Sequence, residues 1–490
     1  MSDSSKIIRN ILIAGEDDNS LELVEIHFSD KIRRINRLLP RSIGWEEISS
    51  RNRWLEWQKK YQSALRSAPN SDIIDGNFHL LIPGAIDSHV HFNTPGFEHR
   101  EDFEHGSAAA ASGGVTTVID MPCTSIPPVT SIKNMESKLN ALSGRSLVDF
   151  AFWGGVSGND LDGGVNVKKQ IIELASAGVV GFKTYLISGM DSFRDLTMEQ
   201  MARVAEWIKP TMLPLAVHAE AKELVLEQQE HFLKIGKKDW CAYYCSRDER
   251  AEALAVARMI QIARKTGCQV HIVHLSSEFG VEMIQNARKE SVPVTAETCP
   301  HYLYFTRDDF DNPEISSYLK TAPPVKTEFD RSALWRGLED GTLSFVTTDH
   351  AGCDPEKEKS SDNFWEVYGG IPGVEHRVSF LFSEGFKKGR INLKKTIDLL
   401  STNPAKYFRI DGKKGSLNIG KDADFALINL WDQQQISADA MHCKGKYTPF
   451  EGVVLETVVE KTFLRGMLIS TRGGNILTKP GYGSFIRAEN

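Results

Sequence analysis

The sequence has few of the features that mark secreted, membrane-spanning or nucleic-acid-binding proteins. Its seven cysteines are an odd number, dispersed and without a CxxC pair, which excludes a zinc knuckle of that pattern and favours reduced thiols in a cytoplasmic protein. No apolar run approaches the length that spans a bilayer, and the N-terminal residues lack the apolar core of a signal peptide. The formal net charge of -7 gives no broad attraction for phosphate backbones or anionic lipid, so neither nucleic acid nor membrane partners are expected.

The composition is that of an ordinary globular protein. Hydrophobic residues make up 41% and charged residues 25% of the 490 residues, so a large core can form without disulfides. The length exceeds that of one typical domain, yet α/β barrels commonly run to several hundred residues as one unit. We therefore expect one large domain with a smaller companion.

A strand-then-helix pattern repeats through the middle of the chain. Each unit has a short apolar run rich in β-branched residues, followed by a longer Ala-rich or charged helical stretch. The runs are 84–92, 114–122, 147–155, 178–186, 213–220, 268–276, 292–300 and 343–351. Eight such units predict a parallel (β/α)8 barrel.

The two ends of the chain have a different pattern, in which apolar and polar positions alternate as in β-strands. We expect residues 1–82 and 411–490 to form the two parts of a small β-sandwich domain, with the barrel over 83–410 between them. An amphipathic helical insertion is predicted at about 41–70, where Trp45, Trp54 and Trp57 stand among charges at helical spacing.

The ends of the predicted strands are rich in metal ligands, and active sites of such barrels lie at this edge. His89 and His91 are two apart on one strand and therefore share a face, whereas His271 is expected on the face opposite His274. Imidazole and carboxylate ligands suit zinc, manganese, cobalt or iron, and the lack of a thiolate cluster indicates an open catalytic site. The candidate metal ligands are His89, His91, Lys183, His218, His274 and Asp349.

Lys183 is the unusual member of this set, because a cationic ammonium repels a metal ion. It has a simple alternative interpretation as a surface lysine at a strand end. If it is buried, desolvation lowers its pKa towards a neutral amine, which can add carbon dioxide and become an anionic carbamate. The carbamate oxygens could then bridge two metal ions.

Two metal ions roughly 3.5 to 4 Å apart would polarise a carbonyl and supply a bridging hydroxide at neutral pH. Asp349 would bind one metal and act as the general base, then deliver the proton to the leaving nitrogen. This predicts a hydrolase.

Several motifs resemble those of the cyclic amidohydrolases, the group of allantoinases, hydantoinases or dihydropyrimidinases, and dihydroorotases. The resemblance covers the chain from about Ile82 to the C-terminal strands, through IPGAIDSHVHFNTPG, SAAAASGGVTTVIDMP, GVVGFK, VHAE, HIVHLSS, ETCPHYL, KTAPPV, TTDHAG, STNPAKYF and GKDADF. It implies one metal on His89, His91 and Asp349, a second on His218 and His274, and carboxylated Lys183 (N6-carboxylysine) between them. Two divalent ions, zinc first, and a homotetramer are also implied.

The motifs HVHFNTPG, DSFRDL, CPHYL and KTAPPV look like allantoinase, which implies conversion of (S)-allantoin to allantoate in purine catabolism. The stretch at 370–385 looks more like a hydantoinase or dihydropyrimidinase, so hydantoins and dihydropyrimidines stay open as substrates. Dihydroorotases carry an arginine where this chain has Asn93, which makes dihydroorotate a weaker alternative. A relative without catalysis that serves as a scaffold is the alternative of a different class, but all six ligand positions are filled.

The chain departs from the allantoinase pattern near the expected substrate ring. Allantoinases usually have MPLN where this chain has MPCT, and DHSPC where it has DHAGC. By position, the candidate substrate-binding residues are Asn93, Cys123, Ala322 and Gly373.

Overall fold

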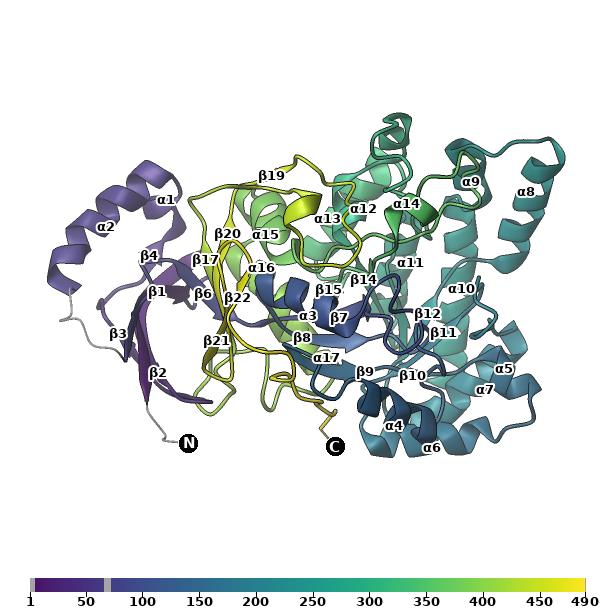
Figure 1. Cartoon of the computed structure of the whole chain (residues 1–490), viewed down its shortest axis with the longest axis horizontal. Coiled ribbons are helices and arrows are strands. Elements are labelled where there is room, and N and C mark those ends of the chain that lie inside the picture. The colour runs from purple at the N-terminus through teal and green to yellow at the C-terminus, as the bar shows by residue number, and fades with distance from the viewer. Residues whose placement is uncertain (1–4, 66–71, 490) are drawn as a thin grey trace.

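The computed structural model describes residues 5–65 and 72–489, and its larger part is a barrel of parallel strands surrounded by helices (Figure 1). The barrel strands are β7 (Ala85–His91), β8 (Val115–Asp120), β9 (Asp149–Phe152), β10 (Gly154–Gly155), β11 (Phe182–Tyr185), β12 (Leu215–His218), β13 (Val270–Ile272), β14 (Val294–Thr298), β15 (Phe345–Val346) and β16 (His350–Ala351). The predicted (β/α)8 fold class is confirmed.

The ring of strands closes through two runs that are each divided into two short strands. One arc has the order β16-β7-β8-β9 and the other the order β10-β11-β12-β13-β14-β15, with parallel pairing throughout. The run at 149–155 continues from β9 into β10, and the run at 345–351 continues from β15 into β16. Chain continuity thus joins the arcs at both places, and the break in the second run holds Asp349.

The helices that follow the strands pack against one another around the barrel. Most begin with a side chain that accepts a hydrogen bond from the backbone of the first turn, as Ser131, Thr197 and Thr327 do. The longer helices of this layer are α3 (Phe103–Ser112), α4 (Ile132–Ala141), α6 (Val167–Ala177), α7 (Met198–Ile208), α10 (Glu249–Thr266), α11 (Glu278–Lys289) and α13 (Glu328–Glu339).

The two ends of the chain form the small β-sandwich domain beside the barrel, where purple and yellow strands adjoin in Figure 1. Its sheet runs in the order β22-β21-β20-β17-β6-β1-β2-β3. These strands are β1 (Lys6–Ala14), β2 (Ser20–Phe28), β3 (Ile32–Arg37), β6 (Leu80–Pro83), β17 (Phe425–Asn429), β20 (Val458–Leu464), β21 (Met467–Thr471) and β22 (Asn475–Ile476). β6 pairs with β17 from the other end of the chain, which is the junction that unites the two segments.

Two helices, α1 (Trp45–Ile48) and α2 (Arg51–Leu65), project beyond the small domain (Figure 1). Trp54 stacks on Trp431 with ring centroids 4.6 Å apart, so this segment packs on the C-terminal part of the domain. Residues 66–71, the end of the predicted insertion, lie outside the described residues. The exact domain boundaries at 82 and 410 stay predictions.

A buried group of charges joins the barrel to the small domain. The Lys414 ammonium lies 2.6 Å from Asp149 of β9, 3.0 Å from Asp422 and 2.7 Å from Asp424. All three carboxylates therefore have a cationic partner.

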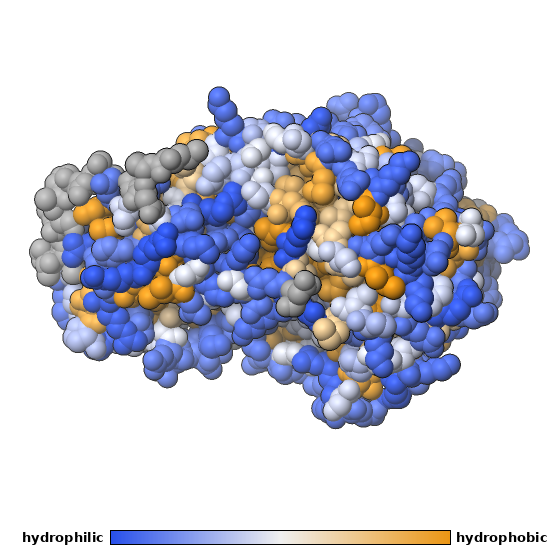
Figure 2. All heavy atoms as spheres, turned by 90° about the horizontal axis from the view of Figure 1, so that it is seen from below, coloured by the Kyte–Doolittle hydropathy of each residue, from blue (hydrophilic) through white to orange (hydrophobic). Residues whose placement is uncertain are grey.

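The face of the molecule in Figure 2 is mainly hydrophilic. On the face in Figure 2, hydrophobic residues gather in patches between hydrophilic ones, most densely near the middle. Among the described residues, no helix is both long and apolar enough to cross a membrane.

Candidate active site

The predicted metal ligands lie at the barrel mouth, at or just beyond the carboxyl ends of the strands. His89 and His91 are in β7, Lys183 is in β11, and His218 ends β12. His274 follows β13, and Asp349 lies between β15 and β16. The structure thus brings together residues that are up to 260 positions apart, because parallel strands all end on the same edge.

Asp349 connects the two histidines of β7. Its Oδ1 lies 3.0 Å from His89 Nε2 and 3.0 Å from His91 Nε2. Burial alone would raise the pKa of Asp349, but the charges and hydrogen bonds of His89 and His91 lower it well below its usual value. The carboxylate is therefore ionised and placed to bind a cation.

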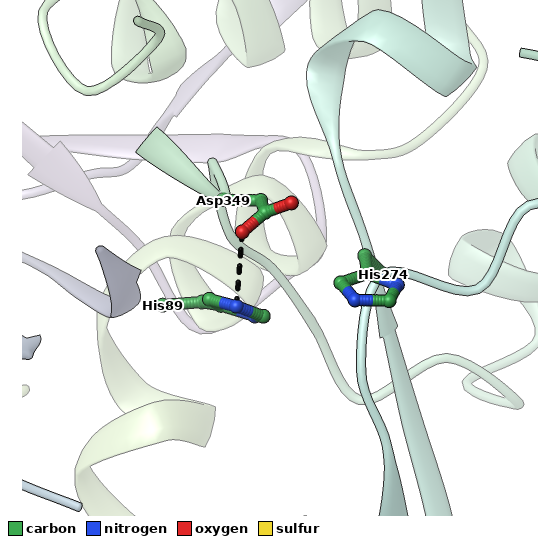
Figure 3. Close-up of side chains that lie close together, drawn as sticks. All are labelled: His89, His274 and Asp349. Carbon is green, nitrogen blue, oxygen red and sulfur yellow. Dashed lines mark ion pairs between the residues drawn. The ribbon is translucent and has the colours of Figure 1, made fainter. Parts of the chain in front are cut away.

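The second pair of histidines faces this group. His218 Nδ1 lies 3.1 Å from His274 Nε2, so two ring nitrogens point at one another. Ligand atoms of His89, His274 and Asp349 all lie within 4.8 Å of one another. Figure 3 shows Asp349 beside His89, with the His274 ring on the opposite side of the gap. These ligand atoms are close enough together to hold a metal ion.

Lys183 is fully buried, and its Nζ has no hydrogen-bond partner among the described residues. Burial lowers the pKa of Lys183 to about 8, although Cys123, Asp349 and Glu297 act in the opposite direction. A buried amine with a lowered pKa and no hydrogen-bond partner, in a group of predicted metal ligands, fits a lysine that carries a carbamate. It does not fit the alternative of a lysine on the surface.

Two of these residues have a backbone conformation that L-residues rarely adopt. φ is +40° at His274 and +49° at Asp349, in the left-handed region. Neither is glycine, so each position costs conformational energy that the surrounding structure must offset. Asp87 provides part of that support, because it accepts hydrogen bonds from the hydroxyl of Thr348 (2.7 Å) and the backbone of Thr348 and His89.

Two buried carboxylates that the sequence analysis missed orient the histidines. Glu297 Oε1 lies 2.6 Å from His89 Nδ1, which directs Nε2 of that ring towards Asp349. Glu220 Oε2 lies 2.8 Å from His218 Nε2, which directs Nδ1 towards His274. A carboxylate that accepts one ring N–H fixes the tautomer and leaves the other nitrogen free to bind metal. Each pair of histidines has one such carboxylate.

The expectation for His271 was wrong. Its Nε2 lies 3.2 Å from Glu297 Oε2, and its ring stacks on Phe345 with centroids 5.2 Å apart. His271 therefore shares a carboxylate with His89 inside the barrel. Strand alternation ends with β13 at Ile272, and the left-handed turn at His274 changes the direction of the chain, so counting along the strand misleads.

A pocket of about 560 Å3 opens over the cluster and contains His89, His91, His218, His274 and Asp349 in its wall. Three of the candidate substrate-binding residues, Asn93, Cys123 and Ala322, also line it. The wall also contains the aromatic side chains of Phe97, Tyr185, Tyr243, Trp365 and Tyr368. The pocket has room for a small ring directly above the predicted metal ligands.

Gly373, the fourth candidate, does not line this pocket. Its backbone N–H donates to Nδ1 of His350, at 3.2 Å, as does the backbone N–H of Val374 at 3.3 Å. Gly373 therefore helps to position the residue next to Asp349, and a part in substrate binding stays a prediction.

Cys123 is one of the departures from the allantoinase pattern, and it contacts a second residue of the wall. Its Sγ lies 3.0 Å from the hydroxyl of Tyr185 and 3.9 Å from His91 Nδ1. The Tyr185 ring stacks on His218, with centroids 5.4 Å apart, and Lys183 Nζ lies 4.5 Å from the centre of the same ring. Tyr185 thus contacts both Cys123 and Lys183.

Comparison with known proteins agrees with this geometry. The model of the amidohydrolase family matches residues 80–469. Allantoinase from Bacillus licheniformis is 36% identical over 408 residues, which cover 82% of this chain and 88% of that protein. Allantoinase from Saccharomyces cerevisiae is 32% identical over 403 residues, which cover 81% and 86%.

L-hydantoinase from Paenarthrobacter aurescens is 31% identical over 433 residues, which cover 86% of this chain and 92% of that protein. The solved structure of L-hydantoinase (dihydropyrimidinase) from Arthrobacter aurescens has a TM-score of 0.86 at 27% identity, and the match covers 98% and 99% of the two chains. The chain therefore belongs to the amidohydrolase family and is a hydrolase that acts on cyclic amides.

Proposed function

We propose that this protein opens the ring of (S)-allantoin to give allantoate, with two divalent metal ions held at the barrel mouth. Zinc is the first candidate, because the ligands are imidazoles, a carboxylate and a modified lysine without thiolates. In this proposal His89, His91 and Asp349 hold one ion and His218 and His274 the other. The buried Nζ of Lys183, orphaned beside these ligands, is the observation that carries the proposal.

Lys183 would join the two sites as a carbamate. Its neutral amine forms a bond to the carbon of carbon dioxide and loses one proton, which gives an anionic carboxylate on the side chain. Because the Nζ is buried, that charge would be uncompensated unless cations bind it. Lysine modification and metal binding therefore support one another.

The bound metal ions would supply Lewis acidity to the amide carbonyl and an activated water. The protein's own part in the reaction is proton transfer by Asp349. We assign this ionised carboxylate the role of accepting a proton from the attacking water and giving it to the ring nitrogen as the C–N bond breaks. Water thus adds a hydroxyl group to the carbonyl carbon and one hydrogen to the leaving nitrogen.

Allantoin is the first substrate because the similarity to allantoinases extends over most of the chain. The motifs HVHFNTPG and KTAPPV, which look like allantoinase, contribute Asn93 and Ala322 to the pocket. A hydantoin is the second candidate. The similarity to an L-hydantoinase and the aromatic side chains in the pocket wall favour it. A cytoplasmic location and a homotetramer stay predictions.

The test is hydrolysis of allantoin, hydantoin, dihydrouracil and dihydroorotate by protein whose metal content is assayed in the same preparation. Preferred turnover of allantoin would support the proposal, and preferred turnover of hydantoin or dihydrouracil would replace it with the second candidate. Failure to hydrolyse all four with both metal sites filled would refute the substrate assignment.

A further inference from the structure

Arg247 is an unassigned cation in the wall of the substrate pocket. It follows α9 (Trp240–Ser246) as the C-cap residue, and its carbonyl accepts a hydrogen bond from the buried Lys326. The side chain is 17% exposed, while its partner Glu220 is fully buried. Arg247 lines the same pocket as His218 and His274. A guanidinium thus borders the space above the predicted metal ligands.

The guanidinium is fixed on one side and available on the other. Its Nη1 donates to Glu220, and its charge lies 5.6 Å from the centre of the Tyr243 ring. Glu220 in turn holds His218 at 2.8 Å, so two hydrogen bonds separate Arg247 from a predicted metal ligand. No other hydrogen bond from this guanidinium to a described residue is present. The remaining N–H groups can meet an acceptor in the pocket.

The other two cations of the pocket wall are already engaged. The Lys320 ammonium donates to the carbonyls of Phe364, Trp365 and Val367, which uses its three N–H groups. Arg100 holds Glu358 with Nε at 2.8 Å and Nη2 at 2.6 Å. Arg247 is therefore the cation of the described pocket wall that is best able to receive a substrate group.

We infer that Arg247 recognises the carbonyl oxygen of the ureido substituent on the substrate ring. This inference rests on the proposed function and deepens it, because allantoin and hydantoin differ by that substituent alone. A charged donor that is held in place by Glu220 loses little freedom when it binds a neutral carbonyl. Arg247 is thus a specificity residue, and the chemical class it selects is a cyclic ureide with a hydrogen-bond acceptor outside the ring.

The test compares kcat/KM for allantoin and for hydantoin in wild type, Arg247→Lys and Arg247→Gln, with metal content measured in each sample. Loss of a hydrogen bond to a charged donor should lower the allantoin-to-hydantoin ratio by about tenfold or more. Lysine keeps the positive charge beside Glu220, so Arg247→Lys should keep its metal. Arg258→Lys, on the exposed side of α10, is the matched control and should keep the wild-type ratio.

Calorimetry with the ring-opened compounds allantoate and hydantoate provides a second readout that does not depend on turnover. Arg247→Lys should weaken the binding of allantoate more than the binding of hydantoate. An unchanged ratio in both variants with full metal content would overturn the inference, as would a fall in the ratio on Arg100→Lys alone. If wild type hydrolyses neither ring, the proposed function itself fails, so the two failures are distinguishable.

Discussion

Among the groups of potential metal ligands in the described residues, two interact with a buried lysine. At the barrel mouth, Lys183 is near enough to His274 and Asp349 for their charges to interact, and its Nζ has no hydrogen-bond partner. At the junction with the small domain, Lys414 lies within 3.0 Å of three aspartates. A lysine is buried in both places, but the Lys183 Nζ has no partner, whereas the Lys414 Nζ has three carboxylates.

The two environments have opposite effects on the lysine. Burial lowers the pKa of Lys183 to about 8. The charges of Asp349 and Glu297 act in the opposite direction but do not offset the effect of burial. Burial also opposes the charge on Lys414, but Asp424, Asp149 and Asp422 raise its pKa well above the ordinary value. Lys414 thus acts as the cation of its own cluster, whereas Lys183 leaves the barrel cluster in need of one.

The largest effect is expected for Lys183→Ala, which removes the proposed bridge. Activity should fall below detection and metal should be lost, because two close cations repel one another when no anion lies between them. A short carboxylic acid such as propionate should restore part of both by replacing the carbamate. To check this prediction, metal content and turnover are measured with and without the carboxylic acid. Lys168→Ala, on the exposed side of α6, is the control. Full metal content in Lys183→Ala would refute the bridge.

Asp349→Asn should lower kcat by about 10²- to 10⁴-fold, since the proton acceptor is lost. The fold should stay intact, because Asp87 and Thr348 still support this turn. Steady-state kinetics, circular dichroism and metal content separate the two effects. Turnover at the wild-type level would rule out Asp349 as the general base.

Lys414→Met should break the second cluster and leave the first unchanged. Three buried carboxylates would lose their shared cation, which should lower the free energy of unfolding by about 3 to 5 kcal/mol. Denaturant unfolding measures this, and Lys413→Met at the exposed neighbouring position should change stability by less than about 0.5 kcal/mol. Loss of bound metal without loss of stability would contradict the separate roles of the two clusters.

The smallest effects are expected for the carboxylates behind the histidines. Glu297→Gln and Glu220→Gln should each weaken metal binding by about 10- to 100-fold, because the ring orientation becomes less fixed. Competition with a chelator should show that each variant weakens metal binding at a different site. Glu223→Gln, on α8 (Lys222–Lys234), is the matched control. Equal weakening of both sites by either variant would show that the carboxylates do not act on separate pairs.

The eight strand-end runs and the group of His89, His91, Lys183, His218, His274 and Asp349 could be found from the sequence, because barrel topology gathers strand ends. Glu220 could have been found too, since it stands two residues after His218. Glu297 lies within a predicted strand, but nothing in its local pattern indicates that it faces His89.

Other features depend on tertiary structure alone. Arg247 belongs to a helical segment far from every ligand in sequence, and only packing of α9 against the barrel mouth brings it to Glu220. The left-handed turns at His274 and Asp349 break the strand alternation, which is why the side-chain direction of His271 was misjudged. Burial of Lys183, which rules out a lysine on the surface, is likewise a property of the folded chain.

The most direct test of the account is titration of metal-free protein with zinc in the presence of bicarbonate, with bound metal and allantoin hydrolysis measured in the same samples. The account predicts that activity rises as two sites per chain fill and that Lys183→Ala neither binds nor responds. Full hydrolysis by metal-free protein, or complete activity with one zinc and an unmodified Lys183, would contradict it.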